Sequence, residues 1–576
     1  MERTGSLLHR QYNSLLGSTL AMTASMYLAG ILDSIMVGRM LGTLALSAIS
    51  LSLSVSFLTN IPIALFTFGG NTLAVTYKGR RDRQTADKVF TLSFLSGVLS
   101  AVAISLVGII LIRPVSGLLS QHNEALEELI AAYLLPLLVL PLLTAVLNPT
   151  AAFARTDGMT RLSTAMPIIA NVINLLCDWL FMGVLHMGIA GAGWATVAGY
   201  LIGCLLAIGY FRSPTRSVRF TRVSGEQLRL LSSIAGTGMP SALIYACNFL
   251  RLFFTNYIIL SATGTVGAQI ASVSFSLNSL AFIFVEGASM TLLPLLGALY
   301  GERDIRGMRL ALRYGMLATL LMCGGILLLS ELLPVQLASL YGLTDPEIVG
   351  IFSATFRIVS INIPLLGVIY VIRTFFQATK QKGLANLLVI LDGFAVVVPL
   401  MWAFSKIDIY WLWASFPISK LVTVLLIAAA VAVVKYRTKA DNLLLLEGED
   451  GEVLDFTIHS TVASALEASA QVVDFCNSHG VDSELSMRLG VATEELCVNT
   501  ARYAGTPTGA IDVYVKIADS FVILKLRDDG AIFNPTDYVD DSGEEITGLA
   551  MVRAVSSKIE YSRVIGFNVT VVTVDR

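Results

Sequence analysis

The chain has few charged residues for its size. Asp, Glu, Lys and Arg make up 14% of its 576 residues, whereas 55% are hydrophobic, and the mean hydropathy is +0.73. This composition excludes an ordinary soluble enzyme, and the chain is too long for one domain. It indicates an α-helical polytopic membrane protein with a further domain attached.

Cysteine is also sparse, and its spacing argues against a zinc site or a disulfide framework. The six cysteines form no CxxC pair and fall mainly in apolar runs, as expected of small core residues: Cys177, Cys204, Cys247, Cys323, Cys476 and Cys497. Histidine is rarer still. His459 and His479 lack the helical phosphoacceptor context of a sensor kinase.

The net charge of −2 hides a division of the chain into two parts. Residues 441–576 hold 23 acidic and 9 basic side chains, a net charge of −14, whereas the preceding residues have a net charge of +12. The chain therefore consists of an apolar, basic part followed by an acidic part, and the two differ in physical character.

The apolar runs of the first part are long enough to cross a bilayer, which takes about 20 residues. They predict twelve transmembrane helices, near residues 14–37, 47–76, 90–112, 127–153, 162–185, 190–211, 231–261, 268–299, 308–333, 347–378, 384–405 and 410–436.

Basic residues and an internal repeat organise these helices. Lys and Arg collect after even-numbered helices, and short cytoplasmic loops are rich in them, so we expect both termini in the cytoplasm. Tyr77–Asp82 after the second helix is similar to Tyr300–Asp304 after the eighth. The repeat predicts two six-helix halves, residues 1–222 and 223–440, with a site between them.

Two acidic residues lie inside the apolar runs of the amino half. Asp33 is in the first predicted helix, and a charge at the centre of a membrane helix costs about 2.5–3.5 kcal/mol, so such residues usually mark an ion or substrate path. Asn171, Asn174 and Asp178 fall three and four apart and share one helix face. The alternative is that Asp33 only caps or pairs within the bundle.

These stretches resemble a known family. Asp33–Gly42 reads DSIMVGRMLG, and Asn171–Asp178 is followed by Gly188–Thr196. Together they are similar to the first helix, the fifth helix and the following turn of multidrug and toxic compound extrusion (MATE) transporters, over residues 10–438. The resemblance implies antiport, in which H⁺ or Na⁺ enters as an organic, often cationic solute leaves.

The resemblance also implies a cation site in the amino half, at the matching residues Asp33, Asn171 and Asp178, with Asn174 on the same face. A desolvated carboxylate can serve in turn as partner of a proton, a sodium ion or a cationic solute. In the carboxyl half, Glu286 and Asp392 lie in apolar runs, with possible internal partners at Arg251, Arg373 and Lys420. Internal ion pairs that hold helices together are the alternative there.

The acidic part begins with a linker, residues 441–452, and continues as a predicted soluble α/β sandwich domain, residues 453–576. Residues 483–503 predict an amphipathic helix in which Glu495 and Asn499 share one face. Residues 512–517 and 521–527 alternate as the strands of a hairpin.

This part is similar to the gyrase/Hsp90/histidine-kinase ATP-binding superfamily, in particular to anti-sigma serine kinases. The resemblance rests on three stretches, Glu494–Asn499, Arg527–Pro535 and Gly548–Arg553. The resemblance implies that Glu495 acts as general base, Asn499 holds Mg²⁺ and Asp528 binds the adenine amino group. It further implies that Gly530 and Gly548 admit the purine and the phosphates of Mg-ATP.

Two departures from that pattern argue against tight nucleotide binding. Ile532 and Ile546 stand where the family has glycine, and a β-branched residue is strained wherever φ must be positive. A degenerate module that only docks a protein is the alternative for this domain.

Two classes of function follow for the whole chain. The first is a secondary transporter in a bacterial plasma membrane whose cytoplasmic domain regulates it. Its expected partners are a small-molecule substrate and a cytoplasmic regulatory protein, and no nucleic acid. The second is a membrane-tethered serine/threonine kinase or anti-sigma-like signalling protein that uses the transporter part as anchor or receptor. Asp33 and Asp178 favour the first, because an anchor needs neither. A flippase for lipid-linked precursors is a third possibility.

Overall fold

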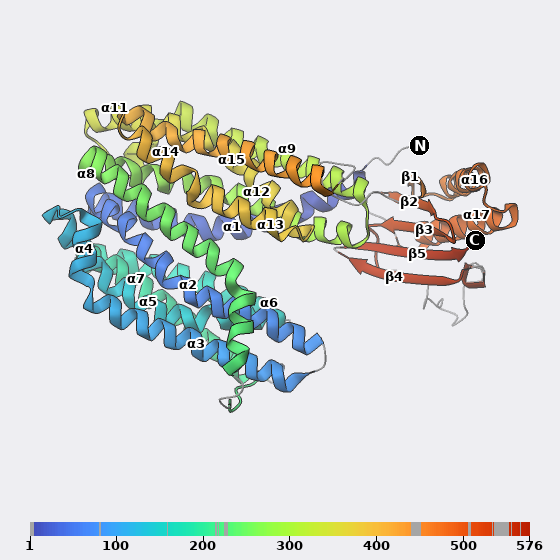
Figure 1. The fold of residues 1–576 in the computed structure, drawn as a ribbon, viewed down its shortest axis with the longest axis horizontal. Coiled ribbons are helices and arrows are strands. Elements are labelled where there is room, and N and C mark those ends of the chain that lie inside the picture. Colours follow the sequence, from blue (N-terminus) through green and yellow to red (C-terminus); the bar gives the residue numbers. More distant parts are fainter. Residues whose placement is uncertain are drawn as a thin grey trace.

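The structure is a computed structural model that describes residues 5–79, 82–157, 159–213, 216, 218–223, 228–438, 451–504, 509–532, 534, 552–554, 556–564 and 566–576. A long bundle of apolar helices carries a smaller domain at one end (Figure 1). We call this the proximal end of the bundle and the opposite one the distal end.

Helices of the amino half follow the predicted spans closely. Their bounds are α1 Ser6–Met40, α2 Thr43–Gly79, α3 Arg83–Ile110, α4 Ile112–Ser120, α5 Glu124–Thr156, α6 Thr160–Asp178, a π-helix at Trp179–Val184 and α7 Gly188–Arg212. The short α4 at the distal end was not predicted, because nine residues are too few to stand out as an apolar run.

The carboxyl half repeats this order. Its helices are α8 Leu230–Gly301, α9 Ile305–Leu332, α10 Pro334–Leu340, α11 Pro346–Ser360, α12 Asn362–Ala378, α13 Lys382–Ile390, a π-helix at Leu391–Ala395, α14 Val397–Phe404 and α15 Ile409–Thr438. The 72-residue α8 is broken at Gly264, where φ is 65° and ψ −159°, and so contains two predicted spans. With α8 divided there, the described residues contain twelve helical spans long and apolar enough to cross a membrane, as predicted.

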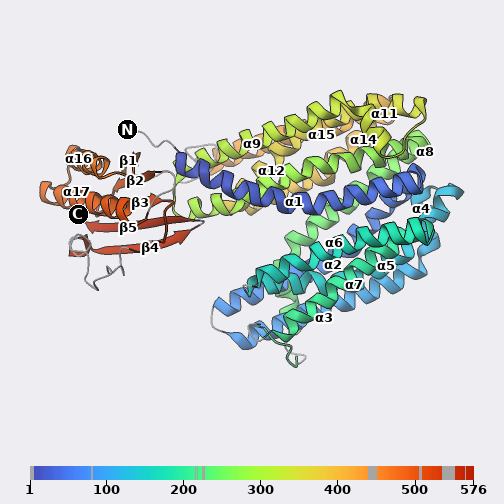
Figure 2. The ribbon, with the colours of Figure 1, turned by 180° about the vertical axis from the view of Figure 1, so that it is seen from behind.

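Two helices exchange partners between the halves. The hydroxyls of Thr19 on α1 and Thr291 on α8 are 2.5 Å apart, so α1 packs along the second segment of α8. The first segment of α8 packs along α2, where a Cβ at Gly238 would lie 1.9 Å from the carbonyl oxygen of Leu65. Figures 1 and 2 show α1 beside α9 and α12, and the start of α8 beside α2 and α3.

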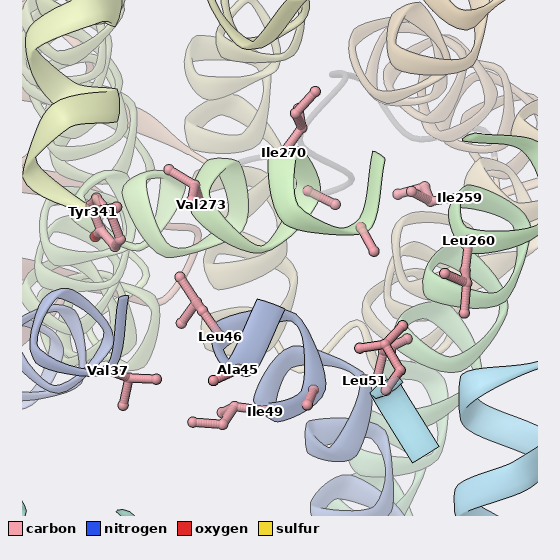
Figure 3. Packing of buried hydrophobic residues seen from close by; sticks show 14 of the residues in the cluster. Val37, Ala45, Leu46, Ile49, Leu51, Ile259, Leu260, Ile270, Val273 and Tyr341 are labelled. Carbon is pink, nitrogen blue, oxygen red and sulfur yellow. The ribbon is translucent and has the colours of Figure 1, made fainter. Parts of the chain in front are cut away.

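The distal end is closed by apolar side chains from both halves. Val37, Leu46 and Ile49 of the amino half pack in one buried cluster with Ile270 and Tyr341 of the carboxyl half (Figure 3). Two polar contacts cross the same contact surface, from Arg39 to the carbonyl oxygen of Leu340 at 3.0 Å and from Thr43 to Gln269 at 2.8 Å. Towards the proximal end the two halves diverge (Figures 1 and 2).

The attached domain is a two-layer α/β sandwich, as predicted. Five antiparallel strands lie in the order β1-β2-β3-β5-β4, with bounds β1 Glu452–His459, β2 Ala510–Ile517, β3 Phe521–Asp528, β4 Lys558–Val564 and β5 Phe567–Asp575. The predicted hairpin is β2–β3. Helices α16 Val462–Ser478 and α17 Ser483–Asn499 share a buried core with one face of this sheet. The predicted helix continues past Asn499 as a π-helix, Thr500–Ala504.

Candidate functional site: a central cavity and a docked nucleotide-site domain

A cavity of about 440 Å³ lies between the two halves. Its walls come from α1, α2 and α5 on one side and from α8, α12, α14 and α15 on the other. Among the described residues that line it, the charged ones are Asp33, Arg251 and Lys420. The position agrees with the site that the internal repeat predicts between the halves.

The amino-half site brings Asp33 and Asp178 together. Their carboxyl groups are close enough for a side-chain hydrogen bond when one of them carries a proton. Asn174 donates to Asp178 at 3.1 Å and lies 3.3 Å from the hydroxyl of Thr196. One oxygen of each carboxyl is buried without a hydrogen-bond partner in the part of the chain that the structure describes. Two adjacent carboxyls with spare buried oxygens have the chemistry of a cation site, because like charges repel unless a proton or metal ion joins them.

Asn171 is less involved than the resemblance implies. It lies one turn before Asn174 on α6 and is half-buried, but its side chain makes no hydrogen bond to any other residue that the structure describes. Thr196 on α7 stands in its place as the further polar neighbour of the site. The sequence gives no sign of this role, because Thr196 comes from another helix.

The carboxyl half contains one internal ion pair of the kind that was the alternative for its acidic residues. Lys420 donates to Asp392 at 2.5 Å. Glu286 lies near the phenol of Tyr27 on α1. The guanidinium of Arg373 lies 3.9 Å from the ring centre of Tyr370.

The two halves place these acids alike. Asp178 is the last residue of α6 and precedes a π-helix, and Asp392 is the second residue of the π-helix that follows α13. Single π-turns inside helices are rare and frequently mark functional sites.

In the soluble domain, Asp528 ends β3 and is buried. One of its oxygens accepts from the backbone N–H of Gly530 and from the side chain of Asn568, both at 2.8 Å. Burial raises the pKa of Asp528 above its ordinary value, and these two hydrogen bonds oppose the rise. Its other oxygen makes no hydrogen bond within the described chain, which leaves it available as an acceptor for a ligand.

Asn568 and Arg563 support this site, although sequence reasoning missed them. Arg563 donates to the side-chain oxygen of Asn568 at 2.6 Å and to the carbonyl oxygen of Gly530 at 3.0 Å. They are brought together by the pairing of β4 with β5, where Arg563 lies opposite Asn568. That register cannot be read from either strand alone.

On the neighbouring helix α17, Asn499 is buried and Glu495 is half-buried. Among the described residues, the side-chain nitrogen of Asn499 has no hydrogen-bond partner. Ile532 is 74% exposed and is not among the described non-glycine residues with positive φ, so the strain considered for this position is absent here. Gly548 and Ile546 lie outside the described residues.

The soluble domain rests on the proximal end through the residues next to Asp528. Arg527 is 2% exposed and donates to Asp304 at 3.0 Å and to Glu302. On the following loop, Asp529 accepts from Arg10 of α1 at 3.0 Å. Apolar side chains complete the contact, since Phe567 and Val569 belong to the same buried cluster as Leu7 and Tyr12.

Comparison with known proteins identifies the membrane part. The MatE family model matches residues 19–180 and 240–403, more than half of the chain. The chain belongs to the MatE family. A second model, the histidine kinase-like ATPase domain, matches residues 458–574. The chain is thus a MATE transporter joined to an ATPase-like domain, which confirms the resemblances to MATE transporters and to the histidine-kinase ATP-binding superfamily.

Several relatives of the membrane part are known by name. The multidrug export protein MepA of Staphylococcus saprophyticus is 22% identical over 450 residues, which are 77% of this chain and 96% of the relative. The probable multidrug resistance protein NorM of Chromobacterium violaceum is 23% identical over 326 residues, 55% of this chain and 69% of the relative.

Solved structures share the fold. The inward-facing conformation of a multidrug resistance MATE family transporter of the MOP superfamily has a TM-score of 0.67 and 19% identity, and covers 74% of this chain and 99% of its own. An outward-facing conformation of such a transporter has a TM-score of 0.59 and 19% identity, with 76% and 100% covered.

The residues of the ATPase-like domain fit Mg-ATP in type and position. Asp528 offers a buried acceptor for an adenine amino group, and the buried side chain of Asn499 lacks a partner that a metal-bound phosphate would supply. Glu495 lies one helical turn before Asn499, so both reach the same region above the sheet. Bound Mg-ATP would supply a phosphoryl group for transfer or a change of charge that the domain can sense.

Proposed function

We propose that this MATE protein is an antiporter that exports organic, cationic or amphipathic solutes from a bacterial cell in exchange for H⁺ or Na⁺. The pair formed by Asp33 and Asp178 carries the proposal, because Asp33 lines the cavity between the halves while Asp178 lies behind it. A coupling cation that joins the two carboxyls removes the negative charge that a cationic solute needs in the cavity. Cation and solute therefore compete for one charge, which is the requirement for exchange.

The orientation that serves export places the soluble domain and both termini in the cytoplasm. Basic residues after even-numbered helices support this orientation. The cavity then belongs to a state closed at the outer, distal end by the apolar cluster around Tyr341.

Transport by the purified protein in lipid vesicles tests the exchange. Dye export should follow an imposed pH or sodium gradient, and Asp33→Asn should abolish it while the protein still inserts, since the amide keeps the volume but not the charge. Asp345→Asn is the matched control, because Asp345 caps α11 at the distal end and Asn caps helices equally well. Gradient-driven export at the wild-type rate by Asp33→Asn would refute the role of the pair.

We further propose that the soluble domain binds Mg-ATP and regulates the transporter. The adjacency of Asp528 to Arg527 supports this. Asp528 belongs to the proposed nucleotide site, and Arg527 is bonded to Asp304 and Glu302 of the membrane part. Ligand binding at this strand end therefore acts directly on the contact with the transporter. A cytoplasmic regulatory protein is a further partner of this domain in the proposal.

Calorimetry on the full chain in detergent tests nucleotide binding. We expect weak binding of Mg-ATP that is lost in Asp528→Asn, because the amide presents a donor where the adenine amino group needs an acceptor. Acidification should weaken binding in the same way, since the raised pKa of Asp528 brings its protonation nearer to neutral pH.

Absence of heat at millimolar Mg-ATP would leave only a docking role. Transfer of phosphate to a protein serine, together with absence of export, would favour the membrane-tethered kinase.

A further inference from the structure

We propose that the connection between the two halves is a membrane-surface site that binds the headgroups of anionic phospholipids. The site consists of residues 216 and 218–223, which we call the inter-half segment, together with the start of α3. Its ligand is a lipid phosphate with a net negative charge, and in the orientation proposed above that lipid belongs to the inner leaflet. The site is separate from the central cavity and does not depend on which solute is exported.

The inter-half segment has an excess of positive charge. Arg216, Arg219 and Arg222 belong to it, and Arg212 at the end of α7 precedes it. All but the half-buried Arg216 are exposed. Among the described residues, none of these four side chains forms an ion pair. An acid beneath the segment, Asp87 of α3, accepts a hydrogen bond from the backbone N–H of Arg219 at 2.8 Å.

Backbone hydrogen bonds hold the inter-half segment against α3. Besides the bond from Arg219 to Asp87, the backbone N–H of Thr221 donates to the hydroxyl of Thr91 at 3.0 Å. Asp87 and Thr91 are about one helical turn apart, so the segment runs along α3 from its proximal start toward the middle of the bundle. It therefore lies along the side of the helix and presents its arginines in a fixed place.

The face of α3 that carries the inter-half segment continues as a lipid-facing surface. Residues four apart lie above one another on a helix, so Leu95 and Leu99 continue the row of Asp87 and Thr91. The side chains of Leu95 and Leu99 are 49% and 66% exposed, as expected of a membrane helix that meets hydrocarbon. The segment thus ends about one turn, or about 6 Å, before the apolar part of this row. This places it where headgroups meet acyl chains.

Phe220 lies between two exposed arginines of the segment. The centre of its ring is 4.9 Å from that of Phe90, 5.3 Å from that of Phe94 and 5.9 Å from that of Phe211, and yet Phe220 is 47% exposed. Aromatic rings beside basic residues suit a membrane interface, because the ring enters the acyl boundary while the cations remain among the headgroups. The flat fork of a guanidinium matches the oxygens of a phosphate.

The soluble domain is the other anionic partner within the chain, since residues 441–576 have a net charge of −14. It is docked on α1, α8 and α9 through Arg10, Glu302 and Asp304. Figures 1 and 2 show it apart from the proximal ends of α2 and α3. It would have to leave that contact to reach the lipid-facing side of α3. The observations therefore favour the membrane as the partner.

A photoreactive benzophenone analogue of phenylalanine at position 220 tests the proposal. The full chain is placed in vesicles of equal parts phosphatidylglycerol and phosphatidylcholine with the same acyl chains. After irradiation, the lipid adducts are quantified by mass spectrometry. The anionic lipid should form at least about fivefold more adduct than the neutral lipid. Both adducts come from one sample, so this ratio does not depend on the yield of the reaction.

Arg219→Gln combined with Arg222→Gln should lower this ratio below about twofold, because each basic residue near the surface contributes to the attraction of anionic lipid. The corresponding pair of Lys variants keeps the charge and should give a higher ratio than the Gln pair. Arg306→Gln combined with Arg309→Gln is the matched control, since it removes two exposed arginines of α9 near the proximal end of the other half. Its ratio should equal that of the wild type.

Four other outcomes would overturn the proposal. One is a ratio near one in the wild type. Another is an equal fall of the ratio in both Gln pairs, because the net charge of the protein then attracts the lipid. A third is loss of the enrichment with millimolar inorganic phosphate at an ionic strength matched with chloride, because the site then binds a free anion. The last is formation of adducts with the soluble domain in place of lipid, which would assign the inter-half segment to a contact within the protein.

Discussion

At the scale of single residues, the two halves use acids at matching places in different ways. Asp178 precedes the π-helix of the amino half and meets Asp33, whereas Asp392 lies in the π-helix of the carboxyl half and is bonded to Lys420. An acid paired with another acid needs a cation, and an acid paired with a lysine does not. This difference supports the proposed cation coupling in the amino half and a positioning role for the Asp392–Lys420 pair.

This assignment predicts the effect of Asp392→Asn. The change leaves the ammonium of Lys420, which is only 8% exposed, without its counter-charge, and loss of one partner of a buried pair costs about 3 kcal/mol. The melting temperature of the purified protein should fall accordingly. Asp392→Asn combined with Lys420→Met should recover most of the loss, because no buried charge is then left unpaired. A double variant as unstable as the single one would contradict a simple ion pair.

Residue-level reasoning from the sequence succeeded where the partners share a helix. The four-residue spacing of Asn174 and Asp178 predicted their contact, which the structure contains. Residue spacing could not predict that Asn568 would hold Asp528, because that contact depends on how distant strands pack. Asp33 and Asp178 had been placed at one amino-half site only through the family resemblance, and the structure brings their carboxyl groups together. The strain expected at Ile532 is not found, since its backbone φ is not positive.

At the scale of helices and strands, hydropathy predicted the long spans. It missed the short helices and the exchange of helix partners between the halves. The short α4 and α10 occupy the same place in both halves at the distal end, and neither has the length of a span. Hydropathy also does not show that α1 and the first segment of α8 pack against the other half. This packing depends on small residues, since helix backbones approach closely only where side chains are absent.

The contact of α2 with α8 predicts the effect of Gly238→Ala. A Cβ at this position would lie 1.9 Å from the carbonyl oxygen of Leu65, so the helices must separate, and overpacking of this kind costs about 1–3 kcal/mol. Thermal unfolding of the purified protein should show the loss. Gly236→Ala on the same helix is the matched control, because its Cβ would meet nothing within 4 Å and alanine favours the helix. Equal stability of the two variants would mean that the contact tolerates a methyl group.

At the scale of the whole molecule, one helix joins the two sites. α1 begins beside the soluble domain, where Arg10 is bonded to Asp529, and continues to Asp33 in the cavity wall. The other side of the contact is Arg527, held by Glu302 at the end of α8 and by Asp304, which caps α9. A change at the proposed nucleotide site therefore has two short structural routes to helices of the cavity.

This arrangement predicts that Arg527→Gln uncouples nucleotide from transport. In the wild type we expect Mg-ATP to change the initial rate of gradient-driven dye export by about fivefold or more, within the usual range of allosteric coupling. In Arg527→Gln the domain loses its buried ionic contact with Glu302 and Asp304 while Asp528 keeps its hydrogen bonds to Gly530 and Asn568. Export should then respond by less than about twofold, with nucleotide affinity within about threefold of the wild type.

Two further variants make that result specific to the contact. Glu302→Gln removes the same ion pair from the membrane side and should also lose the response. Arg488→Gln removes an arginine of the same domain that is 50% exposed and pairs only along its own helix with Glu484, so its response should remain. A full response to Mg-ATP in both Arg527→Gln and Glu302→Gln would show that the signal does not pass through this contact. A response lost in Arg488→Gln as well would assign the effect to the domain's general stability, because that side chain lies away from the transporter.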